Sequence, residues 1–596
     1  MTDQRDAQRE LIERLQRSQL NRRHLVQRAG VVGASATAAA MALRVVGGAA
    51  QDSSPAAGGA PTKSITRDEY KQQLFEAFPQ PEDPTKGGTF IMGDSTDLST
   101  VNVMLSGDSP TNPVLALVFE NLVAPNVVDG SYVPGLADSW EISADGKTYT
   151  YFLNQTAMWH DGTPFTTADV ILSFDAQSSP DTGSSYTTSF TDIVESYSAL
   201  DDYAVAVVMK DVFAPVVVFG NTYCPIVAKH IWENVPFADW AADPGSTGAD
   251  PARVIGTGPF KFQEWTQGER ATLVRNDDYW NDVANIDEFV FQVWPDDATS
   301  IEALRAGDID LVTNPPPADV ESLVAEDSLD VAIYDTFSFG FFGYNLDPEK
   351  TTVFQDVEVR QALIYALDRQ SIVDNIQLGL AEVAQGSQAK LSLAYAPDEI
   401  KTEYTFDVEK AQQLLDDAGW IVGSDGIREK DGQRLAFEAM HPTGNAATDQ
   451  QVAYMQEAWA TIGVEMTPNP VDFNSVLVPA ITESYDYDLV LLGFSWDASA
   501  DQSAMFSSSS YGGGFNFMKY SNPEVDRLNE EARRELDPER RRELLIESAN
   551  IVNDDAPVGI ISFRQDRMAY NVRAVRYTPN AYGDFLWPIQ YISIEE

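Results

Sequence analysis

The middle of the chain alternates between helical segments with one apolar stripe and short, uninterrupted apolar runs. Apolar residues fall at helical spacing after Asp356, after Asp407 and again over residues 452–462, and apolar runs occupy residues 435–440 and 489–492. A helix with one apolar face must be covered on that face, and a strand that is apolar on both faces must be covered twice. The alternation therefore predicts a sheet covered by helices, an α/β fold.

Length and charge narrow the classes of protein to which the chain can belong. Its 596 residues allow three or four compact units, and 43% apolar residues is ordinary for a folded globular protein. The 91 acidic residues against 40 basic ones give a formal net charge of -51. Such a charge disfavours nucleic acid as a partner and favours a soluble monomer.

Cysteine and histidine are too sparse to predict redox or metal chemistry. Cys224 is the only cysteine, so no intramolecular disulfide can form. The four histidines are scattered, and none stands at a spacing typical of metal ligands. We therefore expect neither a metal site nor a cofactor.

The first fifty residues have the pattern of an export signal. Arginines are frequent up to residue 28, and an uncharged run of small and apolar residues fills positions 29–43. A twin-arginine pair, Arg22-Arg23, stands before that run, and small residues precede a cleavage point after Ala50. The pattern predicts a signal peptide of twin-arginine type over residues 1–50, and hence an extracytoplasmic protein.

A composition rich in Ser, Pro, Ala and Gly follows over residues 51–87. It predicts a flexible tether, interrupted by a short charged helix near residues 67–77. The ordered body is expected to begin near Gly87.

Local patterns in the body predict strands and turns. Tyr149, Tyr151 and Leu153 alternate as in a half-buried strand, while Asp145-Gly146 and Asp161-Gly162 are turn pairs. Beside the second turn, we interpret His160 as a turn residue rather than a catalytic or metal-binding one.

Six blocks along the body carry a wider resemblance. They are PGLADSW at 134–140, DGKTYTY at 145–151, WHDGTPFTTADV at 159–170, IGTGPF at 255–260, NDDYW at 276–280 and DVEVRQAL at 356–363. In order and spacing they resemble the family 5 extracellular solute-binding proteins, which are the peptide, nickel and oligosaccharide receptors of ABC importers. The resemblance extends over almost the whole body, from about residue 88 to residue 590.

The resemblance implies a two-lobed α/β fold of the periplasmic-binding-protein type, class II, with an additional domain inserted in the first lobe. The expected divisions are residues 88–125, 254–336 and 564–596 for lobe I, 126–253 for the added domain packed on it, and 337–563 for lobe II. It also implies a function without catalysis, in which a short peptide is captured between the lobes and delivered to permease subunits in the membrane.

The ligand is expected beyond the apolar run at residues 488–492, because ligands of open α/β sheets bind outside the carboxyl ends of strands. Phe494, Trp496 and Asp497 follow that run. By resemblance to peptide-binding members, Asp497 stands where an acid pairs with the α-amino group of the ligand. Asp501 is the alternative partner, since the Asp-Pro that usually follows this acid is missing here.

Further ligand-contact candidates follow other predicted strands and a glycine-rich segment. They are Asp97 and Asn102, after the strand expected at 89–92, and Phe515, Asn516 and Phe517, after the glycines at 512–514. His441 begins the loop in which dipeptide-selective members place an arginine for the carboxylate of the ligand. Its presence favours longer peptides or uncharged ligands over strict dipeptide selectivity.

Other functions fit the sequence less well. Within the same family, an oligosaccharide or a nickel complex is the alternative ligand. A secreted serine hydrolase is the main alternative from another class, because the triplets Gly93-Asp94-Ser95 and Gly107-Asp108-Ser109 resemble one esterase nucleophile block. A serine nucleophile needs a histidine base, and no Asp-x-x-His occurs near the C-terminus.

Overall fold

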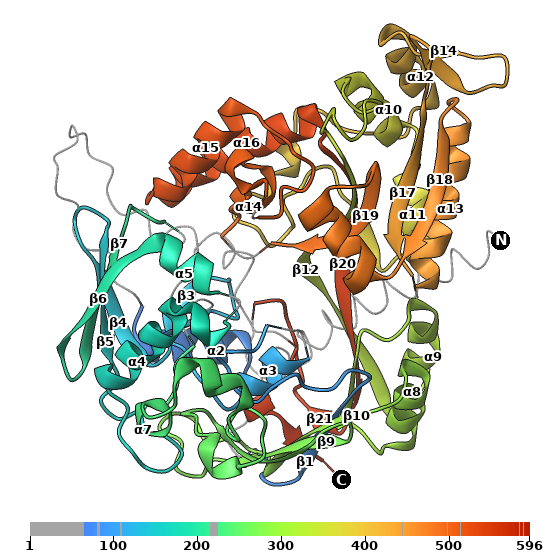
Figure 1. Cartoon of the computed structure of the whole chain (residues 1–596). Helices are drawn as coiled ribbons and strands as arrows, with labels where there is room; N and C mark the ends of the chain where they lie inside the picture. Colours follow the sequence, from blue (N-terminus) through green and yellow to red (C-terminus); the bar gives the residue numbers. More distant parts are fainter. Residues whose placement is uncertain are drawn as a thin grey trace, which may run out of the picture.

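A long mixed sheet runs through the molecule and joins its parts (Figure 1). The computed structural model describes residues 65–79, 84–107, 110–184, 186–214, 225–443, 445–496, 499–512, 514–582, 585–587 and 589–595. The expected signal peptide, Cys224 and Asp497 lie outside these residues. Helices cover the sheet, so the predicted α/β class is confirmed.

The long sheet has eleven strands. In spatial order ten of them are β18 (Glu465–Val471), β17 (Ala436–Pro442), β19 (Leu489–Ser495), β12 (Leu329–Tyr344), β20 (Val558–Asn571), β11 (Leu311–Thr313), β1 (Thr89–Asp94), β10 (Glu288–Val293), β9 (Arg270–Arg275) and β8 (Phe260–Thr266), and β13 (Ala381–Val383) also pairs with β20. The group β17, β18 and β19 is parallel, as is the group β1, β10 and β11. The two long strands β12 and β20 are antiparallel to each other and connect the two groups.

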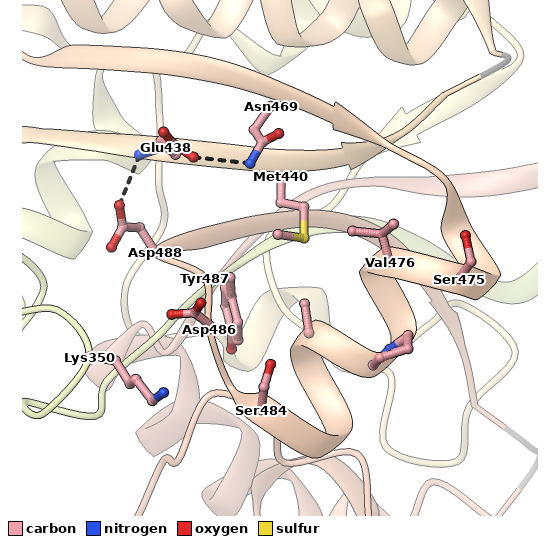
Figure 2. A pocket seen from close by; sticks show the side chains of 12 residues that line it. Lys350, Glu438, Met440, Asn469, Ser475, Val476, Ser484, Asp486, Tyr487 and Asp488 are labelled. Atoms are coloured by element: carbon pink, nitrogen blue, oxygen red, sulfur yellow. Dashed lines mark hydrogen bonds between the residues drawn. The ribbon is translucent and has the colours of Figure 1, made fainter.

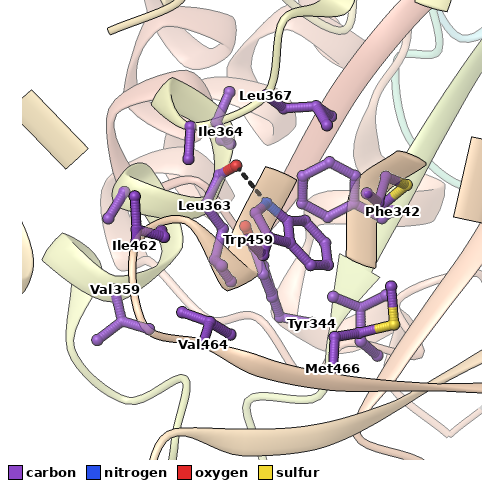
Figure 3. Packing of buried hydrophobic residues seen from close by; sticks show 14 of the residues in the cluster. Phe342, Tyr344, Val359, Leu363, Ile364, Leu367, Trp459, Ile462, Val464 and Met466 are labelled. Carbon is purple, nitrogen blue, oxygen red and sulfur yellow. Dashed lines mark hydrogen bonds between the residues drawn. The ribbon is translucent and has the colours of Figure 1, made fainter. Parts of the chain in front are cut away.

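Helices with the predicted apolar stripes cover one group of strands. They are α10 (Val357–Tyr365), α12 (Val408–Asp417) and α13 (Ala446–Ala460). Their stripe residues are buried in one cluster, where the indole of Trp459 packs on Phe342 and donates a hydrogen bond of 2.8 Å to the carbonyl of Leu363 (Figure 3). The N–H group of that buried indole, its one polar group, is therefore hydrogen-bonded.

The ends of these helices carry the residue types expected of helix caps, and one of them does not act as a cap. Asp407 caps α12 by accepting a hydrogen bond from the amide of Lys410, and Gly419 and Gly463 leave the helical regions with positive φ. Asp356 occupies the N-cap position of α10 but caps no amide, because its carboxylate pairs with Lys430 instead.

The remaining helices lie around the long sheet and the smaller ones. They are α3 (Thr111–Leu115), α4 (Thr167–Ser178), α5 (Thr187–Ile193), α7 (Lys229–Trp232), α8 (Asp297–Ala306), α9 (Val320–Val324), α11 (Arg369–Asn375), α14 (Ser503–Phe506), α15 (Pro523–Arg534) and α16 (Pro538–Asp555). Two π-helical segments, Phe473–Leu477 and Ala480–Ser484, follow β18.

A separate four-stranded sheet forms within residues 126–253. Its order is β4 (Ala137–Ile142), β5 (Thr148–Leu153), β7 (Ala204–Met209) and β6 (Val194–Asp201). Tyr149, Tyr151 and Leu153 are buried as the alternation predicts, and α4 packs on this sheet. The described part also holds two short strand pairs, β2 (Val123–Pro125) with β3 (Tyr132–Pro134) and β21 (Ala574–Val575) with β22 (Ser593–Ile594). A small three-stranded sheet is formed by β14 (Ile421–Val422), β15 (Arg428–Lys430) and β16 (Gln433–Arg434).

The hydrophobic residues form separate cores, and the division between these cores falls within β12 and β20, at the place we call the crossing. One core takes its residues from 90–119, 254–334 and 568–594, and two others take theirs from 337–563. Leu380 is an exception, because it packs with Leu304, Val331 and Ala569 on the other side of the crossing. Among the described strands, β12 and β20 are the two that run through both regions.

The N-terminal segment differs from the expected tether. Helix α2 (Arg67–Ala77) confirms the predicted charged helix, but it lies against the body. Lys71 pairs with Asp282, and the ring of Phe75 meets that of Tyr591 edge-on at 5.8 Å. The prediction that the ordered body begins near Gly87 is therefore wrong for this segment. The contacts that order it come from Asp282 and Tyr591, which are too distant in the sequence for local patterns to indicate.

No helix in the described part of the chain is both long enough and apolar enough to cross a membrane.

Candidate ligand-binding site at the crossing strands

The strands β12 and β20 change register where they pass from one core to the other. Asp335 pairs with Gln565 and Phe339 with Phe563, so three residues of β12 face a single residue, Arg564, on β20. Such a bulge bends and twists a strand pair. The Thr336 hydroxyl holds the bulge by donating to the carbonyl of Arg564 at 3.1 Å.

The carboxyl end of β19 reaches this crossing from one side. Gly493 and Ser495 at its end are exposed, and they pair with Gly340 and Ser338 of β12. The strand is longer than the apolar run at 488–492 predicted, because β19 continues to Ser495. The residues predicted to follow the strand therefore lie at its end and just beyond it.

The carboxyl ends of β1, β10 and β11 reach the crossing from the other side. Asp94 ends β1, accepts a hydrogen bond from the Thr313 hydroxyl at 3.3 Å and lies next to Trp294, whose amide donates to the Asp94 carbonyl at 2.8 Å. Burial raises the pKa of the Asp94 carboxyl. Asn314 then joins this group to the crossing, since its amide donates to the carbonyl of Arg567 on β20.

Three of the predicted aromatic residues come together at the end of β19. Phe494 meets Trp496 at 4.8 Å and Phe515 at 5.1 Å between ring centroids, both edge-on. Trp496 is only 7% exposed, and its indole donates to the carbonyl of Ser387 at 2.7 Å. Phe515 is 55% exposed. Of the three, only Phe515 offers a largely open ring face, whereas Trp496 is packed into the core.

The two predicted acids differ in what the structure shows. Asp497 lies outside the described residues. Asp501 pairs with Arg533 at 3.4 Å and accepts a hydrogen bond from the amide of Ser503 at 2.9 Å. The carboxylate of Asp501 is thus already held by a cation and a helix start.

Asp97 and Asn102 make structural contacts away from the crossing. Both oxygens of Asp97 are bound, one by the indole of Trp265 at 3.1 Å and the other by the amide of Gly268 at 2.7 Å. Asn102 is buried, donates to the Ser246 hydroxyl and accepts from the amide of Met104. Neither side chain is free to meet a ligand without losing these bonds.

The other predicted contacts are also buried. Asn516 is fully buried and bridges Ser507 to Tyr520 with both ends of its amide, and Phe517 stacks on Phe341. His441, only 3% exposed, lies inside β17 and not in the loop after it, with its Nδ1 3.7 Å from the carboxylate of Asp449. The structure therefore gathers Phe494, Trp496 and Phe515 at one place and gives the other described candidates packing contacts.

The crossing itself holds charged residues that were not predicted. Asp335, Arg564, Asp566 and Arg567 all come from the bulged part of β12 and β20. Burial raises the pKa of Asp566, against the effect of the two neighbouring arginines. Each residue is unremarkable in sequence; the only available signal was the FRQDR segment, an unusually charged interruption of an otherwise apolar run at 558–571.

A hollow of about 530 Å³ lies elsewhere, over β17 and the segment before β19 (Figure 2). Its carboxylates are Glu438, Asp486 and Asp488, of which Asp488 accepts from the amide of Glu438 and Glu438 accepts from the side chain of Asn469. It adjoins the amino end of β19, whereas ligands of α/β sheets bind at carboxyl ends. We therefore place the candidate site at the crossing.

The three described histidines contact backbone groups or carboxylates. His160 bonds to the backbone of Gly256 and Gly258, His230 pairs with Asp161, and His441 lies beside Asp449, so no described histidine bonds to Ser95. Asp108 and Ser109 lie outside the described residues. Within the described part of the chain, no three His, Cys, Asp or Glu residues gather as metal ligands.

Two bodies joined by a pair of crossing strands, with strand ends meeting at the junction, define a two-lobed binding protein. The family model described as "Bacterial extracellular solute-binding proteins, family 5 Middle" matches residues 131–517. The chain belongs to this family of bacterial extracellular solute-binding proteins, as the six sequence blocks indicated.

Relatives of known sequence and structure agree in length and fold. The oligopeptide-binding protein AppA of Bacillus subtilis is 28% identical over 509 residues, covering 83% of this chain and 90% of AppA. The dipeptide-binding protein of Escherichia coli is 26% identical over 465 residues, covering 75% of this chain and 83% of that protein. The structure of AppA with a nonapeptide superposes with a TM-score of 0.72 at 27% identity, over 86% of this chain and 100% of AppA. NikZ of Campylobacter jejuni with Ni(L-His) gives 0.71 at 25% identity, over 85% and 99% of the two chains.

Proposed function

We propose that this protein captures a short peptide between its two lobes at the crossing strands and delivers it to the permease of an ABC importer. One observation carries the proposal: the carboxyl ends of β1, β10 and β11 and of β19 meet at the same crossing, from opposite sides. The relatives AppA and the dipeptide-binding protein, both named for peptides, support the choice of ligand.

The proposed lobes follow the division of the cores. Lobe I comprises residues 88–125, 254–336 and 564–596, the added domain 126–253 packs on it, and lobe II comprises 337–563. The protein acts as an exported monomer without catalysis, with permease subunits as its partners. Residues 1–50 act as its twin-arginine signal.

Asp497 is our proposed partner for the α-amino group of the peptide. In the sequence it follows Trp496 directly, and the alternative acid, Asp501, is already engaged by Arg533 and Ser503. A buried carboxylate that loses its pairing partner, or an ammonium that loses its carboxylate, typically costs about 2–5 kcal/mol of binding energy.

Calorimetry with synthetic peptides tests this assignment. Asp497→Asn should weaken binding of a mixed tetra- to nonapeptide pool by about 2–5 kcal/mol, and N-acetylation of the peptides should weaken wild-type binding to a similar extent. Asp501→Asn, the matched change four residues later, should leave affinity almost unchanged. Loss of binding in Asp501→Asn alone would transfer the role to that residue.

The nickel-complex alternative has its own support in the likeness to NikZ, whose structure holds Ni(L-His). Native mass spectrometry of the purified exported protein separates these ligands, since it weighs whatever co-purifies. A peptide mass supports our proposal, whereas a nickel-containing or carbohydrate mass would replace peptide by that ligand. Turnover of ester substrates that disappears in Ser95→Ala would contradict the absence of catalysis.

A further inference from the structure

Arg564 has an unusual position at the crossing. A Cβ added to Gly493 would lie 3.0, 3.2 and 3.4 Å from Nη1, Cζ and Nη2 of Arg564. Three guanidinium atoms at nearly equal distances mean that the group lies flat against the backbone of β19. The guanidinium can rest there only because residue 493 has no side chain.

The guanidinium of Arg564 is also without a protein partner. Among the arginines that the structure describes, Arg564 is the one whose guanidinium neither donates a hydrogen bond nor joins an ion pair. This contrasts with the excess of acidic over basic residues in the chain, 91 against 40. A guanidinium carries five N–H donors, which gain most from a planar anion that can accept two of them at once.

The neighbouring charged groups are occupied elsewhere. Asp335 accepts from the side chain of Gln565 at 2.8 Å and lies 3.6 Å from Lys390. Arg567 donates to the carbonyls of Pro315 and Gln565. Asp566 acts on Arg564 only through its charge, not through a contact. The donors of Arg564 are therefore not needed to neutralise a buried carboxylate at the crossing.

Arg564 lies in a recess rather than on an outer surface. Its side chain is exposed to water, yet the surrounding protein displaces enough water to lower the pKa of its guanidinium. A group that is both accessible and partly desolvated lies between walls of protein. Beside it, a Cβ on Gly340 would meet nothing within 4 Å except the Ser562 hydroxyl at 3.8 Å, which leaves room on that face of β12.

We propose that Arg564 binds a carboxylate of the captured ligand and so selects anionic ligands. In a peptide, that carboxylate is either the C-terminus or an acidic side chain. Dipeptide-selective relatives place an arginine for the carboxylate in the loop where this chain has His441. In our proposal Arg564 takes over that role, and it comes from the crossing strand β20. That the ligand is a peptide rests on the proposed function. That the ligand is anionic rests on Arg564 alone.

The test uses three pools of mixed-sequence tetra- and nonapeptides and two variants. The first pool lacks Asp and Glu and has free C-termini, the second is its C-terminal amide, and the third is the amide with one Glu per peptide. Arg564→Gln removes the cation, and Arg542→Gln makes the same change of charge on α16, where Arg542 pairs with Glu399. Circular dichroism and melting temperature verify that both variants are folded.

We expect wild-type protein to bind the first or the third pool at least tenfold more tightly than the second. Preference for the first pool identifies the C-terminus, and preference for the third identifies an acidic side chain. Arg564→Gln should lose that preference while retaining its affinity for the amide pool, and Arg542→Gln should behave as wild type. A preference that survives in Arg564→Gln, or no preference in wild type, overturns the role of Arg564 and leaves peptide binding intact.

If none of the three pools binds, the proposal that the ligand is a peptide is refuted. Arg564 is then tested with dicarboxylic acids and oligomers of galacturonic acid by the shift in melting temperature. A shift in wild type that disappears in Arg564→Gln supports the anionic ligand. The absence of any shift in wild type overturns it.

Discussion

At the scale of single residues, three of the sequence blocks that resemble the family, at 159–170, 255–260 and 276–280, are bonded to one another. The glycines of the block at 255–260 lie against the backbone, because a Cβ on Gly256 would approach the carbonyl oxygen of Val118 to 1.8 Å. The block at 276–280 supplies Tyr279 and Trp280, which donate to the buried carboxylate of Glu120 at 2.8 and 2.9 Å. The contacts of these residues are thus with the scaffold around Val118 and Glu120.

His160 makes two of the bonds between these blocks. Its Nδ1 accepts from the amide of Gly256 at 3.2 Å, so the proton is on Nε2, which donates to the carbonyl of Gly258 at 3.1 Å. Burial lowers the pKa of His160 to about 4. The sequence-based interpretation as a turn residue is confirmed, with the added role of tying residues 159–165 to the segment 256–258.

This low pKa makes stability depend on pH. The unfolded chain binds a proton at His160 below about pH 6.5, whereas the folded chain does so only near pH 4. The stability due to the neutral ring is therefore complete above pH 6.5 and is lost as pH falls to about 4, by roughly 3 kcal/mol at most. Urea unfolding of wild type and His160→Gln should show a difference that shrinks between pH 7 and pH 4.5. A difference that is constant over this range would contradict the assignment.

At the scale of elements, α2 shows how a segment in a low-complexity region acquires order. Arg67 donates to the carbonyl of Gly135 at 2.6 Å, and its guanidinium lies 4.6 Å from the ring centre of Trp280. Leu74 is the buried residue of the helix, at 4% exposure. A capping box formed by Thr66 and Glu69 fixes where the helix begins.

The packing of α2 on the body should depend on the buried side chain of Leu74. Truncating a buried leucine to alanine typically costs about 2–5 kcal/mol. Leu74→Ala should therefore raise hydrogen exchange over residues 67–77 while leaving the strands of the long sheet protected. Gln72→Ala, on the exposed side of the same helix, should change exchange little. If Leu74→Ala exchanged as slowly as wild type, the helix would be held by other contacts.

At the scale of the whole molecule, residues of the segment 126–253 touch the part of the chain at 337–563 away from the crossing. The segment after β7 meets the end of α15, where Asp211 pairs with Arg534 at 2.8 Å and the amide of Ala214 donates to the carbonyl of Arg533 at 2.7 Å (Figure 1). Arg533 also reaches Asp501 and lies 5.5 Å from the ring centre of Phe213. We call the contact between residues 211–214 and 533–536 the latch. It lies beside the loop that carries Asp501.

The latch should shift the balance between open and closed forms. Removing the pair in Asp211→Asn/Arg534→Gln should increase the radius of gyration of ligand-free protein in small-angle X-ray scattering, because fewer contacts hold the lobes together. Added salt should produce part of the same change in wild type, since both side chains are about half exposed. Arg527→Gln, which pairs only within α15, is the control. An unchanged radius in the double variant would mean that the latch does not restrain the lobes.

Much of the fold could be predicted because its signals are local. The stripes of α10, α12 and α13 and the alternation in β5 each arise within about ten to fifteen neighbouring residues, where helix and strand periodicities are visible. The aromatic group at the end of β19 was found in the same way, because Phe494 and Trp496 follow the apolar run directly. Asp97, Asn102 and Asn516 also follow such elements, but their polar groups are bound by protein.

The amino-acid sequence by itself determined the family, the α/β class and several elements, namely α2, α10, α12, α13, β1, β5, β17 and β19. Only the tertiary structure decided what lies at the crossing, because Arg564 and the Thr336 hydroxyl that holds its strand are 228 residues apart in the chain. The same holds for the guanidinium of Arg564 against Gly493, for α2 on the body and for the latch. Periodicity records which face of an element is buried, but not which distant residue is brought to meet it.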